Sequence, residues 1–368
     1  MKLFILSSAE NIHTIRWVNS LAERGNRIFL FSFFNPDNDY KFHENIELYN
    51  CKIQKKNTLF HKVSYLSTID VLKEKIDRFA PDILHAHYAS SYGLLGALTD
   101  FHPYVISAWG SDVYDFPRKN ILTKWVLKYN LHKADYILST SYVMAKEIEK
   151  YTNKQILVTP FGVDINLFKK QKKENLTVPF VIGCVKSLIP KYGIDVLIKT
   201  FKVVVDRNPG VPIKLQIIGD GSYKEEYQHL VNELGLGQYV QFMGKIVNNR
   251  LPEYYNKFSV SVFTSVLNSE SFGVSVVEAM ACECPVIVSN VGGFLEVIKD
   301  GETGIIVPKG NIEITANAIQ RFIDNPDLGK VMGEKGRKRV KDLYDWDRNV
   351  ETMIGIYKTV KYPFKKSE

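Results

Sequence analysis

The chain of 368 residues is too long for one compact core and suits two domains. Hydrophobic residues make up 45% of it and charged residues 24%, which is an ordinary balance for a globular protein. The net charge of +8 is spread along the sequence, which favours a surface that attracts phosphates or anionic lipid over a nucleic-acid groove, although a merely solvated basic surface explains it equally well.

We expect no targeting or membrane segment in the first residues of the sequence. The apolar run 28–34 is far too short to cross a bilayer. Glu10 closely follows the run 3–6 and no small-residue cleavage site appears, which argues against a signal peptide. The four cysteines are irregularly spaced and predict neither a disulfide framework nor a zinc site. We therefore expect a cytoplasmic protein, either free or peripheral at the cytoplasmic face of the membrane.

Strand and helix patterns alternate through the first half of the chain. Apolar residues recur at helical spacing between Ile12 and Ala22, and Gly25 supplies a stop. Short apolar runs predict strands at 2–7, 28–34, 83–87, 104–108, 136–139 and 156–159. This alternation is typical of a parallel sheet with crossover helices.

The alternation restarts after a charged stretch at 169–175, which reads as a linker. Strands are predicted at 180–185, 214–219, 240–244, 260–264, 285–289 and 304–307, and helices at 194–205, 223–234, 274–281 and 312–323. We therefore expect an α/β protein of two tandem Rossmann-like doubly wound domains, at 1–168 and 176–344. Because ligands bind beyond the carboxyl ends of such strands, the chemistry is expected in a cleft between the domains.

The most informative stretch runs from Ser269 to Met280. A strand leads into a polar loop and then a helix start, where the backbone amides of Phe272, Gly273 and Val274 would favour an anion. Glu270 precedes this turn and Glu278 lies one to two turns into the helix, so the two carboxylates are placed to hold a sugar and a ribose at opposite ends of a diphosphate. A solvated loop acid and a surface helix acid are the plain alternative.

These residues resemble the E-x7-E motif of the family-4 retaining glycosyltransferases, which have the GT-B fold. Further family motifs follow in the family's order and cover residues 160 to 350 almost continuously. They are Phe161-Gly-Val-Asp-Ile-Asn-Leu-Phe168, Leu215-Gln-Ile-Ile-Gly-Asp-Gly221, Val240-Gln-Phe-Met-Gly244, Glu278-Ala-Met-Ala-Cys-Glu-Cys-Pro-Val-Ile287, Val291-Gly-Gly-Phe-Leu-Glu296 and Asp300-Gly-Glu-Thr-Gly-Ile-Ile-Val-Pro308.

The resemblance implies a nucleotide-sugar donor and a role for each motif residue. Glu270 would face the donor sugar, with the amides of residues 272–274 near its hydroxyls and the distal phosphate, and Glu278 would hold the ribose. The remaining donor-binding positions would border the nucleobase or the donor loop, and they are Gly219, Gly221, Gly244, Lys245 and Ile246. A final helix at 345–360 would pack back on the first domain.

Two lysines are the proposed cations for the departing diphosphate. The family usually supplies an Arg and a Lys from the loop after the first strand of the second domain, but here Ser187 and Tyr192 occupy those alignment positions. Lys186 and Lys191 each lie one position earlier, so we expect them to provide the positive charge through a slightly different loop path. Two solvated loop lysines are the alternative.

The first half of the chain matches the family less well. Its usual donor-contacting histidine is replaced by Trp109. Asp112 either receives the acceptor proton or orients the acceptor, or it caps the next helix. His87, near the end of a strand, is an acceptor-side candidate or a buried structural histidine. His13 and Arg16 are acceptor-side candidates for a phosphate or a sugar.

The family analogy predicts retention of the anomeric configuration by a same-face displacement, because no residue reads as a covalent nucleophile. We expect no metal and no cofactor, since Asp37 and Asp39 lie in a loop rather than at a strand end. A UDP-sugar donor and a lipid-linked glycan acceptor of bacterial surface polysaccharide synthesis are the favoured substrates, with the aromatic residues of 31–42 as a possible membrane-side surface or simply a core strand.

Three other functions stay open at this point. A nucleotide-sugar epimerase shares the fold but is not expected to carry Glu270 and Glu278 at this spacing. A dinucleotide-dependent dehydrogenase is suggested by Gly219-Asp-Gly221, yet the G-x-G-x-x-G turn fails because position 224 is Lys. A non-catalytic nucleotide-sugar binder is compatible with the displaced lysines and the missing histidine.

Overall fold

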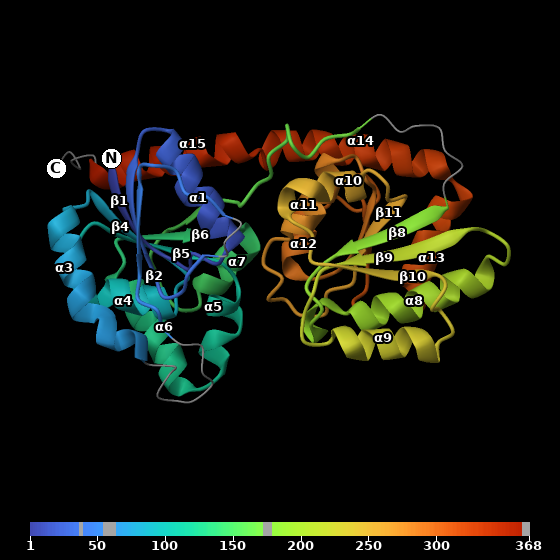
Figure 1. Cartoon of the computed structure of the whole chain (residues 1–368), viewed down its shortest axis with the longest axis horizontal. Coiled ribbons are helices and arrows are strands. Elements are labelled where there is room, and N and C mark those ends of the chain that lie inside the picture. Colours follow the sequence, from blue (N-terminus) through green and yellow to red (C-terminus); the bar gives the residue numbers. More distant parts are fainter. Residues whose placement is uncertain (37–39, 54–63, 172–178, 363–368) are drawn as a thin grey trace. The chain divides into compact units, whose positions relative to one another are not determined.

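The computed structural model describes the whole chain apart from residues 37–39, 54–63, 172–178 and 363–368. It divides into two compact units, which are described separately: unit 1 holds residues 1–160 and 347–368, and unit 2 holds residues 161–346 (Figure 1). Each unit is built on one parallel sheet with helices on both faces. The predicted fold class of two Rossmann-like α/β domains is confirmed.

Unit 1 contains a seven-stranded sheet in the order β3-β2-β1-β4-β5-β6-β7, in which all neighbouring strands run parallel. Its strands are β1 (Lys2–Leu6), β2 (Arg27–Ser32), β3 (Ile46–Asn50), β4 (Ile83–His87), β5 (Tyr104–Ala108), β6 (Tyr136–Ser139) and β7 (Ile156–Val158). Its helices are α1 (Ile12–Glu23), η1 (Ser64–Thr68), α3 (Ile69–Phe79), α4 (Ser91–Thr99), α5 (Ser111–Tyr114), η2 (Phe116–Arg118), α6 (Ile121–Lys133), α7 (Tyr142–Ile148) and most of α15 (Trp346–Lys361).

Unit 2 contains a six-stranded parallel sheet in the order β10-β9-β8-β11-β12-β13. Its strands are β8 (Phe180–Val185), β9 (Ile213–Ile218), β10 (Val240–Gly244), β11 (Val260–Phe263), β12 (Val286–Ser289) and β13 (Ile305–Val307). Its helices are η3 (Pro190–Tyr192), α8 (Ile194–Arg207), α9 (Lys224–Glu233), η4 (Asn248–Arg250), α10 (Leu251–Tyr255), α11 (Val274–Ala281), α12 (Gly292–Val297), α13 (Ile312–Asp324) and α14 (Pro326–Leu343).

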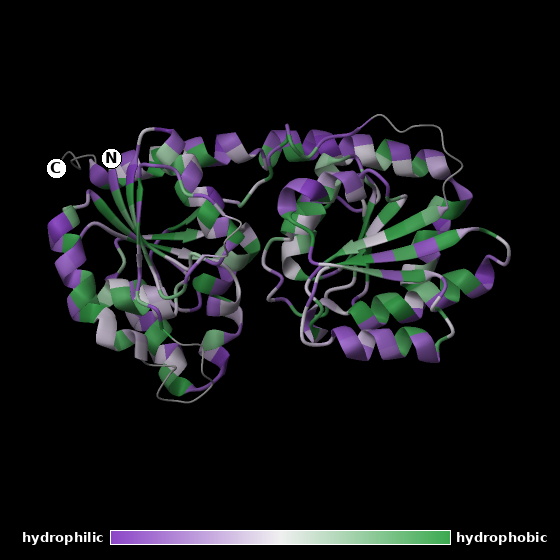
Figure 2. Ribbon diagram, viewed as in Figure 1, coloured by the Kyte–Doolittle hydropathy of each residue, from purple (hydrophilic) through white to green (hydrophobic). Residues whose placement is uncertain are grey.

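Burial on both faces explains why these strands are continuous apolar runs rather than alternating ones. Residues 3–6 of β1 are fully buried, and all four residues of β12 are also buried. Figure 2 shows the sheets as predominantly hydrophobic, whereas the surrounding helices carry hydrophilic residues on part of their surface. Within the described residues, no helix is both long enough and apolar enough to span a bilayer.

The last helix, α15, groups with unit 1. Its residues Val350, Ile354 and Tyr357 lie on one face and are buried, as their helical spacing predicts. The Tyr357 hydroxyl lies 2.6 Å from Nδ1 of His85 on β4. Arg24, which directly follows α1, forms ion pairs with two acidic residues of α15, at 2.6 and 2.8 Å.

Two features differ from the sequence-based expectation. Strand β3 was not predicted, because the half-exposed edge sequence IELYN lacks a strong apolar run. Residues 161–168 were assigned to the first domain, but they belong to unit 2. Val163 exchanges backbone hydrogen bonds with Tyr344 and Trp346, and the buried Phe168 lies against the ring of Tyr255, which fixes this segment to unit 2.

Candidate functional site

The two sheets each have a point where the strand order reverses, and these points locate the candidate residues. In unit 2 the first strand, β8, is flanked by β9 on one side and by β11 on the other. The carboxyl ends of β8 and β11 therefore mark the point at which doubly wound sheets bind ligands. Lys186 directly follows β8, and Glu270 lies in the loop after β11.

Lys186 and Glu270 form a buried ion pair. The Nζ atom of Lys186 lies 2.6 Å from Oε2 of Glu270, and the two side chains are only 9% and 10% exposed. The Ser265 hydroxyl donates to the same carboxylate oxygen at 3.3 Å. The ammonium group also lies 4.7 Å from the ring centre of Tyr192 and 5.6 Å from that of Phe294. Two aromatic rings and one carboxylate thus enclose this cation.

The surroundings of Lys186 keep it charged. Burial by itself would lower the pKa of the ammonium, but the adjacent Glu270 carboxylate and the Tyr192 hydroxyl outweigh it, so the pKa is raised above its ordinary value. The contact between the Tyr192 ring and Lys186 was not predicted from the sequence.

Lys191 lies against the same segment from a different direction. Its Nζ donates a hydrogen bond of 2.8 Å to the backbone carbonyl of Ser269, and its own carbonyl accepts from Val266. Gly193 adopts a φ of +61°, and a Cβ there would approach the Thr264 carbonyl oxygen to 2.2 Å. Only glycine therefore permits the loops after β8 and β11 to run this close together.

Helix α11 begins directly after these loops. Gly273 is its N-cap residue with a φ of +94°, and a Cβ there would clash with the ring of Phe294 at 2.8 Å. The first amides of any α-helix have no partner within the helix, so the turn at residues 272–274 presents donors to an anion. The side chain of Phe272 itself points into the core, against Tyr344 and Phe161.

Glu278 lies on the second turn of α11 and is 2% exposed. Asn248 donates to its Oε1 atom at 2.8 Å, and the hydroxyl of Tyr255 donates to its Oε2 atom at 3.1 Å. The carboxylate is therefore held in one orientation by two neighbours. Neither neighbour was predicted, and their side chains come from η4 and α10, which no motif marks.

The glycines predicted near the donor divide into two groups. Gly219 and Gly221 let the loop after β8 pack closely against them. A Cβ at Gly219 would lie 1.9 Å from the Lys186 carbonyl oxygen, and a Cβ at Gly221 would lie 2.5 Å from that of Leu188. Gly244 has a φ of +70° and accepts a hydrogen bond from the Gly219 amide. Lys245 and Ile246 follow it at the end of β10, where Lys245 is exposed.

In unit 1 the strand order reverses between β1 and β4, and the acceptor-side candidates gather beyond these strands. The ring of His87 lies 4.7 Å from that of Trp109, and the ring of His13 lies 6.3 Å from Trp109 in an edge-on arrangement. His87 is buried, while Arg16 on α1 is half-buried and close enough to His13 to affect its charge. Tyr88, next to His87, has a strained φ of +88°.

Asp112 is fully buried and bound to the backbone. Its carboxylate accepts hydrogen bonds from the amides of Ala89 at 2.6 Å, Gly110 at 2.8 Å and Trp109 at 3.2 Å. These amides belong to the loops after β4 and β5, so Asp112 ties the two loops together. Burial raises its pKa, although the backbone amides counteract part of that increase. Asp112 lies in the first turn of α5, whose N-cap residue is Gly110.

Two family models match the chain. The model described as Glycosyl transferases group 1 matches residues 166–339, and the model described as Glycosyl transferase 4-like matches residues 2–141. Between them they account for most of unit 2 and most of unit 1.

The chain belongs to the group 1 glycosyltransferases of GT-B fold.

Individual relatives agree with this family. The chain is 26% identical to N-acetyl-alpha-D-glucosaminyl L-malate synthase of Bacillus anthracis, over 93% of this chain and 90% of that protein. It is 31% identical to the capsular polysaccharide biosynthesis glycosyltransferase CapM of Staphylococcus aureus, but over only 54% of this chain and 51% of that protein. The structure of Anabaena HepE in complex with UDP has a TM-score of 0.79 at 18% identity, covering 98% of this chain and all of that one, which speaks for the fold alone.

Some aromatic residues of this glycosyltransferase were assigned two alternative roles, and the structure distinguishes between them. Phe31 and Phe33 are buried in the core of unit 1, where Phe33 stacks on Tyr92 at 4.1 Å. A membrane-side surface at these two positions is therefore wrong, because the rings are covered on both faces of the sheet. The predicted loop acids Asp37 and Asp39 lie outside the described residues.

The buried histidines of unit 1 predict a loss of stability in mild acid. Burial lowers the pKa of His87 to about 3 and lowers that of His85 well below its ordinary value, with His87 adding to the effect. Below the ordinary histidine pKa of about 6.5, these histidines are protonated in the unfolded chain but stay neutral in the folded chain. The free energy of unfolding therefore falls as the pH falls. Each histidine should contribute about 1.4 kcal/mol per pH unit in urea unfolding between about pH 5 and 6.

His87→Leu should lower the number of protons taken up on unfolding by one. The free energy of unfolding should therefore change less steeply with pH than in the wild type. His229→Leu, at an exposed position on α9, is the matched control. It should leave the pH dependence of the unfolding free energy of unit 1 unchanged. A slope for His87→Leu equal to that of the wild type would mean that His87 is protonated in the folded protein.

Proposed function

We propose that this glycosyltransferase is a retaining enzyme that moves a hexosyl or N-acetylhexosaminyl group from a UDP-sugar to a hydroxyl of a lipid-linked glycan. The observation that carries the proposal is the pairing of Lys186 with Glu270 beside Lys191 and the first turn of α11. Two cations, a helix N-terminus and a carboxylate at one sheet crevice match the needs of a sugar diphosphate better than those of a neutral ligand.

The two lysines and the α11 amides are proposed to hold the diphosphate. As the bond between the anomeric carbon and the phosphate oxygen breaks, negative charge develops on the departing UDP. Fixed positive charge at that position stabilises the transition state more than the ground state. Lys186 is already charged and buried, so it needs no change of protonation when the donor binds.

The two carboxylates are proposed to bind the two sugars of the donor. Glu270 would accept hydrogen bonds from hydroxyls of the transferred sugar, and Glu278 from the ribose. The Glu278 carboxylate is fixed by Asn248 and Tyr255, which keeps it in a defined orientation. The nucleobase would lie near residues 244–246.

The reaction is proposed to proceed on one face of the sugar. The acceptor oxygen forms the new bond to the anomeric carbon on the side from which UDP departs, and the acceptor proton passes to the leaving phosphate. Metal independence is part of the proposal, because Lys186 and Lys191 supply the charge that a divalent cation would otherwise provide. The acceptor contacts are assigned to unit 1, with His13, Arg16, His87 and Trp109 as candidates.

The activities after which the relatives are named support the proposed substrate classes. One is a synthase of an N-acetylglucosaminyl compound, another acts in capsular polysaccharide biosynthesis, and the HepE structure contains UDP. These names motivate a UDP-sugar donor and a surface-glycan acceptor for this chain.

A donor screen tests this proposal. The purified chain, incubated with UDP-, GDP- and ADP-sugars and a membrane extract as acceptor, should release UDP from one UDP-sugar and retain activity in EDTA. Proton NMR of the product should show the anomeric configuration of the donor. Release of GDP or ADP only, an inverted product, or an absolute need for metal would contradict the corresponding part of the proposal.

Variants of the two glutamates should separate sugar contacts from nucleotide contacts. Glu278→Ala should weaken the binding of free UDP by about tenfold, since it removes a charged hydrogen-bond acceptor. Glu270→Gln should lower turnover by about a hundredfold, yet bind UDP as tightly as the wild type or more so, because Lys186 is released from its partner. Calorimetric titration with UDP and a turnover assay measure both effects.

The exposed Glu253 on α10 provides the matched control for this pair. Its replacement by Gln removes a carboxylate from the same unit, where it pairs with Arg250 at 3.3 Å, and should change neither UDP affinity nor turnover. Equal losses of UDP affinity in Glu270→Gln and Glu278→Ala would show that the two roles are assigned wrongly.

A further inference from the structure

The outer face of α6 combines large apolar side chains with lysines. Ile121, Leu122 and Trp125 are 82%, 65% and 61% exposed, and Ile121 is the most exposed large hydrophobic residue of the described chain. Such side chains are normally buried, so three of them within five residues form an unusual surface for a protein in water.

The same helix has one face buried on unit 1 and one face exposed. Leu127, Asn130 and Leu131 are buried and hold the helix on unit 1, so the opposite face is turned outward. On that outward side, Lys124 and Lys128 are exposed between the apolar residues, and the helix contains no acidic residue. Trp125 stacks on Tyr129 with ring centres 5.5 Å apart, which orders the aromatic part of the surface.

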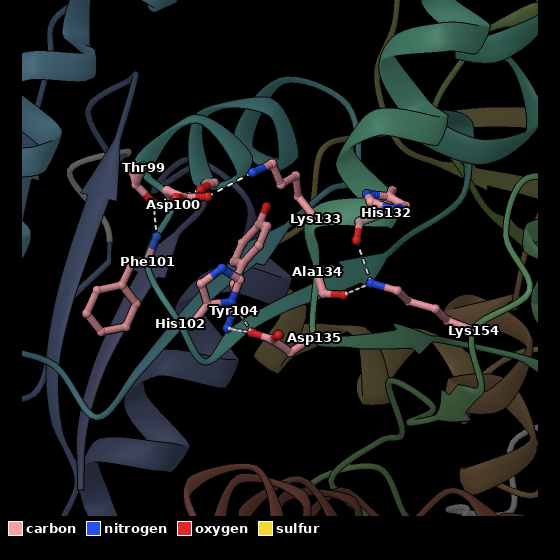
Figure 3. A network of polar contacts seen from close by, with 11 residues as sticks. Thr99, Asp100, Phe101, His102, Tyr104, His132, Lys133, Ala134, Asp135 and Lys154 are labelled. Carbon is pink, nitrogen blue, oxygen red and sulfur yellow. Dashed lines mark hydrogen bonds and ion pairs between the residues drawn. The ribbon is translucent and has the colours of Figure 1, made fainter.

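Polar contacts fix the other end of α6, as Figure 3 shows. Lys133 forms an ion pair with Asp100 at 2.8 Å, and Lys154 donates to the carbonyls of His132 and Ala134 at 2.5 Å each. Asp135, just beyond the helix, accepts from the Tyr104 amide and from His102, at 2.7 Å each. The C-terminal end is thus anchored to β5 and β6, so the exposed residues at the N-terminal end are held in fixed positions.

We propose that the α6 face, defined as Ile121, Leu122, Lys124, Trp125 and Lys128, docks this protein on the surface of an anionic lipid bilayer. An interfacial helix buries its apolar side chains at the level of the lipid headgroups, where tryptophan is favoured and lysines pair with phosphates. The charge of the face complements such a surface, and the net charge of +8 acts in the same direction.

This surface deepens the proposed function, since a lipid-linked acceptor would lie at the surface on which the chain docks. The docking proposal places the membrane-binding surface on α6 and not on the aromatic residues of β2. Membrane binding is nevertheless measured without donor or acceptor. Failure of the docking proposal is therefore distinguishable from failure of the proposed transfer reaction.

The test uses vesicles of phosphatidylcholine mixed with phosphatidylglycerol, and vesicles of phosphatidylcholine alone. The whole chain should sediment with the anionic vesicles and much less with the neutral ones. Trp17 and Trp346 are buried and Trp109 is half-buried, so a blue shift of the emission on vesicle addition should come mainly from Trp125. Trp125→Phe should remove this shift.

Two sets of variants separate the apolar and ionic parts of the surface. Ile121→Ser with Leu122→Ser should lower the partition coefficient at least about tenfold at any salt concentration. Lys124→Gln with Lys128→Gln should lower it about fivefold per lysine at low salt, with a smaller effect at high salt. Val211→Ser with Val331→Ser, at positions 42% and 47% exposed in unit 2, is the control and should bind normally.

Thermal unfolding of each variant establishes that it is folded, which is expected because these side chains are exposed. Equal sedimentation of the wild type and the Ile121→Ser, Leu122→Ser variant would overturn the proposal. A concentration-dependent dimer that this variant abolishes, without any binding of the wild type to vesicles, would also overturn it and assign the face to a second copy of the chain.

Discussion

The buried ion pair between Lys186 and Glu270 is the interaction on which the candidate site depends. Its 2.6 Å contact joins the loop after β8 to the loop after β11, and both side chains are nearly excluded from water. Removing one partner of such a pair leaves an uncompensated buried charge, at a cost of about 3–5 kcal/mol. In the proposed reaction, the diphosphate replaces Glu270 as the partner of Lys186, and hydroxyls of the sugar replace Lys186 as the partners of Glu270. Each charged group therefore has a partner before and after the donor binds.

The fold explains why this pair forms at this position. Strands β8 and β11 are neighbours at the point where the strand order reverses, which is where doubly wound sheets bind their ligands. Gly193 and Gly219 then allow backbone approaches that any side chain would prevent. In the proposed site, the backbone amides at the start of α11 supply the remaining donors to the diphosphate. The chemistry of the site therefore needs few special residues, which are placed by backbone geometry.

Much of this could be predicted from the sequence, and the remainder has physical reasons. Buried strands such as β4, β5 and β8 were predicted at their observed limits because both faces are covered, which leaves uninterrupted apolar runs. The edge strand β3 escaped prediction because it is only half-buried. The aromatic enclosure of Lys186 and the support of Glu278 by Asn248 and Tyr255 depend on contacts between distant segments, for which no local pattern exists.

The most direct test of this account is a double-mutant cycle of Lys186→Met and Glu270→Gln, measured as unfolding free energy with and without saturating UDP. The account predicts that the double variant is destabilised far less than the sum of the single variants in the free protein. It also predicts that the coupling shrinks when UDP is bound, because the diphosphate then partners Lys186. Additive effects in the free protein, or the same coupling energy with and without UDP, would contradict the claim that Lys186 and Glu270 pair with each other only until the donor binds.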